Sequence, residues 1–393
     1  MKEHAVKRTR QHQEEQFQKT PEKKRTFLSW LKYAALFLLI LGISGILFLK
    51  LNTAAAAEFT DHVLRPLIGD SNVIFMEKIF FNAQDELQRL TTKQKNIEAP
   101  TFGDETANIA GGNLDLAPIS IINKFQPLPG EGVWKNRPLK AFLGKEAMAV
   151  TFVRSDPDRP YSITTLAQID KSLVNLGSVA GTEQPGGPVG KPGPGVVPKD
   201  IIDSGRLIAA FDGGFQYKDG QFGMIVGDTT YLPLKNDLGT LVGYKDGSLK
   251  IVDYKGQSLG NNIEFIRQNC PILVQDGNVA VSDPRNRQLW GRLVIGTVDI
   301  FTWRSGIGIT KNGNIIFAVG NNLTPTTLAN ALKAGGAVNA IQLDINPIWV
   351  RFNIFDYLAN GKYDSYTLTK DLQDGSKAYL DGYEKDFFYI YKK

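Results

Sequence analysis

The apolar residues fall into two patterns along the chain. Residues 33–49 form one uninterrupted apolar run without a charge, bracketed by Lys32 and Lys50. From about residue 133 onward, the apolar runs are short and are separated by turn residues. The first pattern is typical of a membrane-spanning helix, and the second of a β-rich globular domain.

The charges around the long run predict its orientation. Residues 1–32 are a basic tail, and such an excess of Lys and Arg favours a cytoplasmic N-terminus. We therefore expect a cytoplasmic tail over 1–32, a single-pass transmembrane signal-anchor over 33–51, and an extracytoplasmic remainder. The alternative is a cleaved signal peptide, for which Ala54–Ala57 supply the small residues. A buried core helix fits poorly, because the run has no polar face.

Residues 52–132 separate the anchor from the domain. Their apolar spacing predicts a helix from Asn72 to about Lys95, with Ile79, Leu87 and Leu90 on its apolar positions. Residues 99–132 are irregular and contain Pro, Gly and Asn, as a linker does. This region is expected to be a stalk.

Residues 133–393 read as one domain. Strands are predicted over Ala147–Val153 and Arg206–Phe211. A helix is predicted to follow Thr324, with Pro325 in its first turn. Together these features predict an α+β fold with a mixed, antiparallel-rich sheet and packed helices. Turn dipeptides predict three hairpins: Asp246-Gly247, Asp276-Gly277 and Asn312-Gly313.

The charge distribution and the rare residue types exclude several classes of partner and of catalytic site. The net charge of +5 comes from the first 50 residues, which carry ten Lys and Arg against four Glu, so no nucleic-acid partner is expected. Cys270 is the one cysteine, and the three histidines end at His62. A disulfide, a Ser-His-Asp triad and a His-ligated metal are therefore excluded beyond residue 62.

Two aspartates directly follow apolar strands. Asp212 ends the run Arg206–Phe211, and Asp344 ends the run Ala340–Leu343. A charge at the end of a buried strand sits on rigid backbone, which suits a catalytic group. A turn-capping role is the alternative for each aspartate. Asp212 and Asp344 are the candidate catalytic residues.

Neighbouring residues are candidates for binding a substrate. Gly213 and Gly214 let backbone N–H groups approach an anion. Arg304 can hold a phosphate through two parallel hydrogen bonds, with a surface ion pair as the alternative. Trp303 and Trp349 can stack on sugar rings, with core packing as the alternative. No cofactor is expected, and the acidic spacing gives no metal signature, although a divalent cation held by carboxylates stays open.

Five segments in order resemble the phosphodiester glycosidase family: Ala209–Phe215, Asn269–Gly277, Arg304–Gly308, Thr324–Lys333 and Ala340–Asp344. This family is typified by the lysosomal uncovering enzyme, which removes N-acetylglucosamine from a phosphodiester on mannose. Its bacterial relatives are often associated with exopolysaccharide. The resemblance implies roles for Asp344, Arg304, Gly213 and Gly214.

The chain departs from the family pattern at three places. Asp212 stands where the family has Asn, and Ser305-Gly306 replaces Thr-Ala. Residues 345–349, Ile-Asn-Pro-Ile-Trp, replace a Gly-Gly-Gly-Ser-Ser run, and Pro347 has no N–H to donate.

The resemblance, together with the anchor predicted from residues 1–51, implies a membrane-anchored hydrolase that cleaves a sugar-1-phosphodiester or a related glycosidic bond on an envelope glycan. Asp344 and Asp212 would supply the acid, base or nucleophile, and Arg304 would hold the phosphate. The alternative is a non-catalytic surface module with a degenerate site that binds a glycan or a protein. A third reading is a structural envelope protein that self-associates through the helix at 72–95.

Overall fold

The computed structural model describes residues 65–92, 97–102, 112–121, 123–290 and 301–393, together with Tyr33 and Val63. Except for Tyr33, the predicted tail and anchor lie outside these residues. Among the helices that are described, none combines the length and the apolarity that a bilayer crossing requires. Residues Ile68–Lys393 form one compact unit.

The helix predicted from Asn72 to about Lys95 is confirmed as α5 (Asp70–Thr91), which follows the short α4 (Arg65–Ile68), and its role as a stalk stays a prediction. Asp85 connects α5 to the rest of the unit, because its carboxylate forms an ion pair with Arg159 at 2.9 Å. Tyr161 also donates to Asp85 at 3.0 Å. Among the α5 side chains that the structure describes, Met76, Ile79, Leu87 and Leu90 are exposed. Self-association through them stays a prediction.

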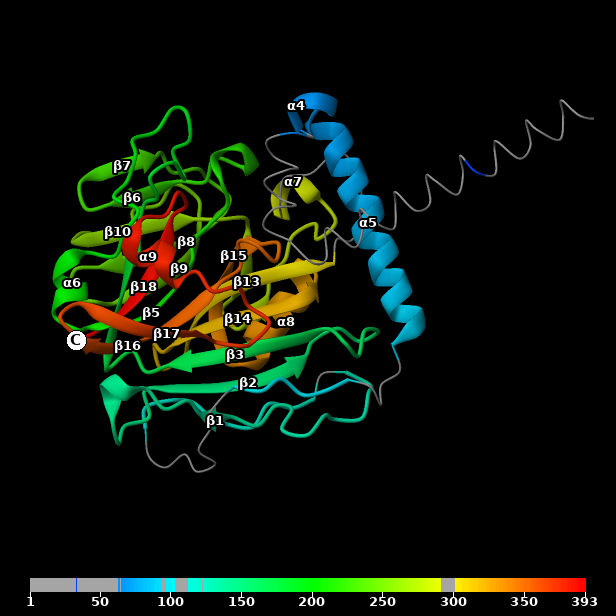
Figure 1. The fold of residues 1–393 in the computed structure, drawn as a ribbon, viewed down its shortest axis with the longest axis horizontal. Coiled ribbons are helices and arrows are strands. Elements are labelled where there is room, and N and C mark those ends of the chain that lie inside the picture. The colour runs from blue at the N-terminus through cyan, green and yellow to red at the C-terminus, as the bar shows by residue number, and fades with distance from the viewer. Residues whose placement is uncertain are drawn as a thin grey trace, which may run out of the picture. The chain divides into compact units, whose positions relative to one another are not determined.

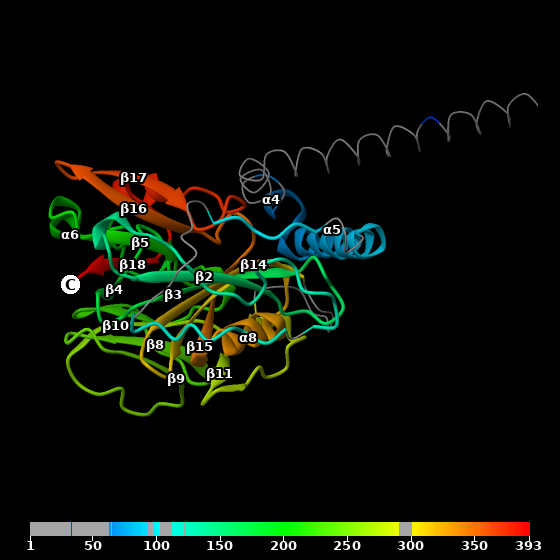
Figure 2. The same cartoon turned by 90° about the horizontal axis from the view of Figure 1, so that it is seen from below.

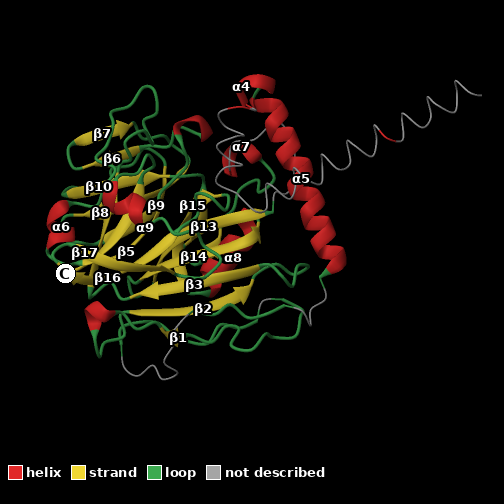
Figure 3. Cartoon of the chain, viewed as in Figure 1, coloured by secondary structure: helices red, strands yellow, loops and turns green. Residues whose placement is uncertain are grey.

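The largest sheet has eight strands, and each neighbouring pair is antiparallel (Figures 1 and 3). The predicted hairpins at Asp276-Gly277 and Asn312-Gly313 are confirmed within it. The strands in spatial order are β1 (Lys135–Asn136), β2 (Met148–Arg154), β3 (Ile163–Ile169), β14 (Ile315–Leu323), β13 (Thr302–Thr310), β15 (Ala337–Ile345), β11 (Ile272–Gln275) and β12 (Asn278–Val279).

Two five-stranded antiparallel sheets complete the β-structure, and Figure 2 shows β16 and β17 on one side of it and β8 and β9 on the other. The predicted hairpin at Asp246-Gly247 joins β8 and β9. One sheet has the order β7 (Thr229–Leu232), β6 (Met224–Val226), β10 (Ile263–Gln268), β8 (Leu238–Tyr244), β9 (Leu249–Tyr254). The other has the order β17 (Lys362–Thr367), β16 (Phe352–Ala359), β5 (Leu207–Asp212), β18 (Phe387–Lys392), β4 (Val174–Val179).

Helices are few and mostly short. The predicted helix after Thr324 is α8 (Pro325–Ala334), and Thr324 and Thr327 form a reciprocal capping box at its start. Leu328 and Leu332 bury α8 against one face of the eight-stranded sheet. The antiparallel-rich part of the predicted fold is thus confirmed, with fewer helices than strands, but the prediction of a mixed sheet is wrong for the described strands, whose pairs are all antiparallel. The other described helices are α6 (Lys199–Asp203), α7 (Arg287–Trp290), α9 (Ser376–Asp381), and the 3-10 turns η3 (Lys140–Phe142) and η4 (Tyr217–Asp219).

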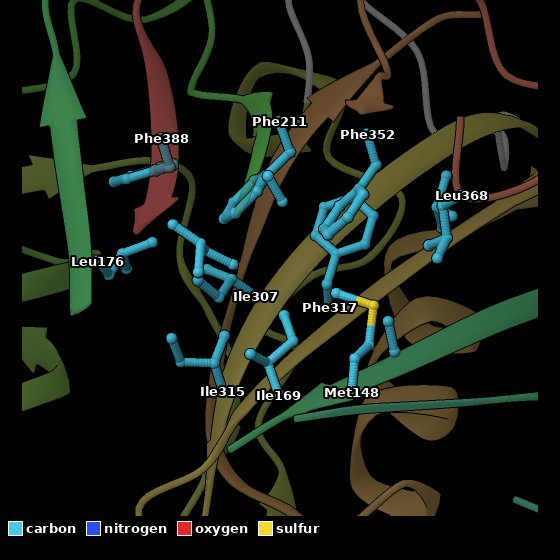
Figure 4. Packing of buried hydrophobic residues seen from close by; sticks show 14 of the residues in the cluster. Met148, Ile169, Leu176, Phe211, Ile307, Ile315, Phe317, Phe352, Leu368 and Phe388 are labelled. Carbon is cyan, nitrogen blue, oxygen red and sulfur yellow. The ribbon is translucent and has the colours of Figure 1, made fainter. Parts of the chain in front are cut away.

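The main core lies on the other face of the eight-stranded sheet and takes side chains from all three sheets. Figure 4 shows labelled side chains from two of these sheets, among them Phe211, Phe317 and Phe352. At the centre of this core, the rings of Phe211, Phe317 and Phe352 lie 4.8–5.4 Å apart between centroids. Aromatic packing of this kind fixes backbone position. Since Phe211 directly precedes Asp212, the core fixes the backbone that carries that carboxylate.

Candidate active site

Strands from two different sheets bring the predicted aspartates together. β5 ends at Asp212, and Asp344 is the penultimate residue of β15. The main-chain N–H of Asp344 donates to Asp212 Oδ2 at 3.2 Å and to Ser305 Oγ, on the adjacent strand β13, at 3.0 Å. The two aspartates therefore meet, although they are 132 residues apart in the chain.

Asp212 is buried within a set of hydrogen-bond donors, and only 2% of its surface is exposed. Ser305 Oγ–H donates to Asp212 Oδ2 at 2.5 Å, and the main-chain N–H of Arg351 donates to Oδ1 at 2.9 Å. These bonds favour the ionised carboxylate, whereas burial and the charge of Asp344 disfavour it. Burial dominates and raises the pKa of Asp212 to about 7.

Asp344 is equally buried but has a cation beside it. Its Oδ2 forms an ion pair with Lys385 Nζ, and its Oδ1 accepts from the N–H of Ile345 at 2.9 Å. Lys385 is itself buried, and its Nζ lies 4.6 Å from the ring centroid of Trp349. Burial raises the pKa of Asp344 to about 6, although the charge of Lys385 opposes the rise.

The two carboxyl groups form one coupled site that holds a proton near neutral pH. Asp344 ionises first, because Lys385 stabilises its negative charge. Asp212 retains the proton to higher pH, because burial and the charge of Asp344 act on it together. A protonated carboxyl beside an ionised one can act as general acid and as base or nucleophile. Among the residues described, His, Cys, Asp and Glu form no group of three that fits a metal ion.

Comparison with known proteins places part of this site in a family. Residues 205–344 match the sequence model of a family described as phosphodiester glycosidase. We refer to residues 205–344, which are similar to this family, as the glycosidase segment. The segment begins just before β5 and ends at Asp344, so it contains both carboxylates and Ser305. Lys385 and Arg351 lie beyond it. No curated protein gives a significant match.

Three solved structures are similar in part. The zebrafish N-acetylglucosamine-1-phosphodiester alpha-N-acetylglucosaminidase catalytic domain, auto-inhibited by its pro-peptide, is 14% identical, with 66% of this chain and 88% of that chain covered and a TM-score of 0.37. A hypothetical protein from Synechocystis is 11% identical, with 66% and 62% covered and a TM-score of 0.32. An exported protein from Burkholderia pseudomallei K96243 is 11% identical, with 60% and 75% covered and a TM-score of 0.27.

The paired glycines of the glycosidase segment contact a second buried ion pair. The N–H of Gly213 donates to the main-chain oxygen of Asp386 at 3.2 Å, and the N–H of Gly214 donates to its Oδ2 at 2.9 Å. A Cβ on Gly213 would lie 2.1 Å from Asp386 Oδ2, and one on Gly214 would lie 2.4 Å from Arg267 Nη2. This close approach accounts for both glycines, and a role as substrate donors stays a prediction.

Arg304 faces away from the carboxylates. Adjacent residues of a strand point to opposite faces, so Ser305 faces Asp212 while Arg304 lies on the face that α8 covers. Its Nε donates to Leu323 O at 2.9 Å, and its Nη1 donates to Trp290 O at 3.1 Å and to Gln342 Oε1 at 2.9 Å. The guanidinium thus joins β13, β14 and β15, and phosphate binding by Arg304 stays a prediction.

The two tryptophans differ in their relation to the carboxylates. Trp349 is half-buried, and its ring lies beside Lys385, the cation that pairs with Asp344. Trp303 is half-buried against the main core, one strand position before Arg304. Stacking on a sugar ring stays a prediction for both, and Trp349 has the closer link to the carboxylates.

Sequence reasoning missed Lys385, Ser305 and Arg351. Ser305 was visible only as a departure from the family pattern. Lys385 and Asp386 directly precede the apolar strand β18, so they are charged residues at the start of a strand, as Asp212 is at the end of one. This pattern could have marked Lys385 as a candidate. A charged residue at a strand boundary is common in turns, however, and the pattern does not indicate which residue it pairs with.

Proposed function

We propose that this protein is a membrane-anchored, extracytoplasmic hydrolase that cleaves a sugar-1-phosphodiester or a related glycosidic bond on an envelope glycan. One observation carries the enzymatic part: a glycosidase segment that brings two buried carboxyl groups together, with pKa values of about 7 for Asp212 and about 6 for Asp344. Glycoside hydrolysis uses such a pair, one carboxyl protonated and the other ionised.

The environments assign the two roles. Asp344, paired with Lys385, is the ionised group that serves as base or nucleophile at the anomeric carbon. Asp212 carries the proton and gives it to the leaving oxygen as that bond breaks. As Asp212 becomes negative, the hydroxyl of Ser305 and the N–H groups of Arg351 and Asp344 stabilise its new charge.

The decisive experiment is a hydrolysis screen of the full chain against sugar-1-phosphodiesters, with the released sugar measured. We expect turnover of at least one phosphodiester and its loss in Asp344→Asn. Absence of turnover on every phosphodiester, together with measurable glycan binding, would instead support the non-catalytic binding module.

Anchoring rests on the sequence pattern of residues 1–51, with its basic tail and charge-free run. A reporter fused after residue 60 is expected outside the cytoplasm, and a cytoplasmic reporter would contradict the proposal. N-terminal sequencing of the exported protein distinguishes a retained anchor from a signal peptide cleaved near Ala54–Ala57.

A further inference from the structure

A phosphodiester carries a negative charge, so the proposed function requires a cation that is available to it. Several cationic side chains belong to the elements that carry or adjoin the two carboxylates, but their hydrogen bonds differ. Arg267 donates from all of its N–H groups to protein acceptors, including both oxygens of Asp386. Arg304 donates to acceptors on β14, β15 and α7, and Lys385 is paired with Asp344.

Arg351 differs from these cations. Its main-chain N–H donates to Asp212 Oδ1, which places the residue directly beside the acid. Its side chain is half-buried, and Nε donates to Ile348 O at 3.1 Å. Among the described residues, no acceptor lies within hydrogen-bonding distance of Nη1 or Nη2. The outer edge of the guanidinium is therefore open to a ligand.

The guanidinium is held in one place. Its central carbon lies 5.2 Å from the ring centroid of Tyr383. On another side it meets Gly375, where an added Cβ would lie 2.6 Å from Arg351 Cδ and 3.2 Å from Nη1. A preoriented arginine loses less freedom when it binds an anion, and its planar fork matches two phosphate oxygens.

One acidic side chain, that of Asp374, lies close enough to Arg351 to compete with a ligand for its guanidinium. The charge of Arg351 lowers the pKa of Asp374, in addition to hydrogen bonds from Ser376 and Asn353, while burial acts in the opposite direction. Asp374 Oδ1 accepts from Asn353 Nδ2 at 2.6 Å and from the N–H of Ser376 at 2.9 Å. These bonds hold Asp374 without an ion pair to Arg351.

We propose that Arg351 binds the phosphate group of the substrate through Nη1 and Nη2, next to the leaving oxygen that Asp212 protonates. The inference rests on the proposed function. It names an anionic phosphodiester as the substrate class of the site, and it assigns the phosphate to Arg351 instead of to Arg304.

The test compares two substrates of one sugar, an anionic 1-phosphodiester and a neutral aryl glycoside, on full-chain variants. Arg351→Gln is expected to lower kcat/KM for the phosphodiester by roughly 10- to 100-fold, the value of a charge-assisted contact. The neutral glycoside is expected to change by less than about threefold. Arg351→Lys should recover part of the loss. Gly375→Ala retains the charge but displaces the guanidinium, so it should also lower kcat/KM for the phosphodiester and leave kcat/KM for the neutral glycoside unchanged.

Arg206→Gln is the matched control. Arg206 also stacks on a tyrosine, with its central carbon 5.5 Å from the Tyr391 ring, and its Nε donates to Ser204. It lies just before the start of β5, the end opposite Asp212. This variant should leave kcat/KM for both substrates and the affinity for phosphate unchanged.

A second readout does not depend on turnover. Titration of the full chain with inorganic phosphate should show binding that Arg351→Gln weakens by roughly 10-fold or more and Arg206→Gln does not. Unchanged phosphate binding in Arg351→Gln, or equal losses on both substrates, would overturn the role of Arg351. A wild-type protein that binds phosphate through Arg351 but hydrolyses neither substrate would overturn the proposed function and leave the binding site standing.

Discussion

Lys385 and Asp386 are adjacent in the chain, yet they belong to two different kinds of buried charge cluster. Asp386 pairs with Arg267 in a closed arrangement, where both carboxylate oxygens and the whole guanidinium have protein partners. Lys385 pairs with Asp344, whose ionisation is coupled to that of Asp212. The first cluster has its hydrogen bonds satisfied, and the second contains two carboxyl groups whose pKa values burial raises.

The difference between the two clusters distinguishes a buried ion pair that stabilises the fold from buried charges that can take part in a reaction. A buried ion pair whose hydrogen bonds are all satisfied fixes the segments that it joins, here β10, the Gly213-Gly214 turn and the start of β18. Two carboxyl groups with raised pKa values near one cation cost stability and are typical of functional sites. Each of the following predictions tests this contrast.

The largest effect is expected from removal of the proton donor. Asp212→Asn should lower kcat/KM by about 10²- to 10⁴-fold, because the amide cannot protonate the leaving oxygen. The variant should still fold, because the amide has nearly the same shape, although its NH2 group must face a donor that the carboxylate accepted from, so some stability should be lost. Asp356→Asn is the control, because Asp356 is also buried but pairs with the exposed Lys140. Full activity in a folded Asp212→Asn protein would rule out the acid role.

Breaking the closed pair should act on stability. Arg267→Met leaves Asp386 buried without its cation, so we expect the free energy of unfolding to fall by about 3–5 kcal/mol. Lys385→Met should cost less, because Asp344 has a raised pKa and can take up a proton when its partner is lost. Urea denaturation near neutral pH measures both changes. Equal losses would mean that the two pairs are alike.

The carboxyl pair should make the protein less stable as the pH rises. Both folded-state pKa values lie above the ordinary value of about 4. The native state therefore binds more protons than the unfolded state between about pH 4 and 7, and the free energy of unfolding falls across that window. Asp212→Asn should reduce this fall in the free energy of unfolding across the window, by a few kcal/mol at most. Denaturation series across the window, compared with Asp356→Asn, provide the measurement.

The smallest expected effect is a displaced pH optimum. Activity requires ionised Asp344 and protonated Asp212, so the wild-type profile should be bell-shaped, with limbs near pH 6 and pH 7. Lys385→Met removes a positive charge from Asp344, which raises the pKa of that carboxyl and moves the acidic limb upward by about one unit. A profile of kcat/KM against pH measures the shift. An unmoved acidic limb would show that Lys385 does not control Asp344.

Much of the fold followed from local patterns. The three turn dipeptides produced the expected hairpins, and the box around Thr324 began the expected helix. These features depend on residues a few positions apart, where backbone preference and capping bonds act directly. The strand ends at Asp212 and Asp344 were visible for the same reason.

The sequence by itself therefore determined a part of the elements, among them the three hairpins, α5 and α8, and the two aspartates worth considering. Only the tertiary structure decided the partners of those aspartates, because Lys385 and Arg351 lie 41 and 139 residues away from the carboxylates they bind. Strand alternation already implied that Arg304 and Ser305 face opposite sides. Which of them faces the carboxylates depended on how β5 packs against β13 and β15, a contact between sheets that local preference does not encode.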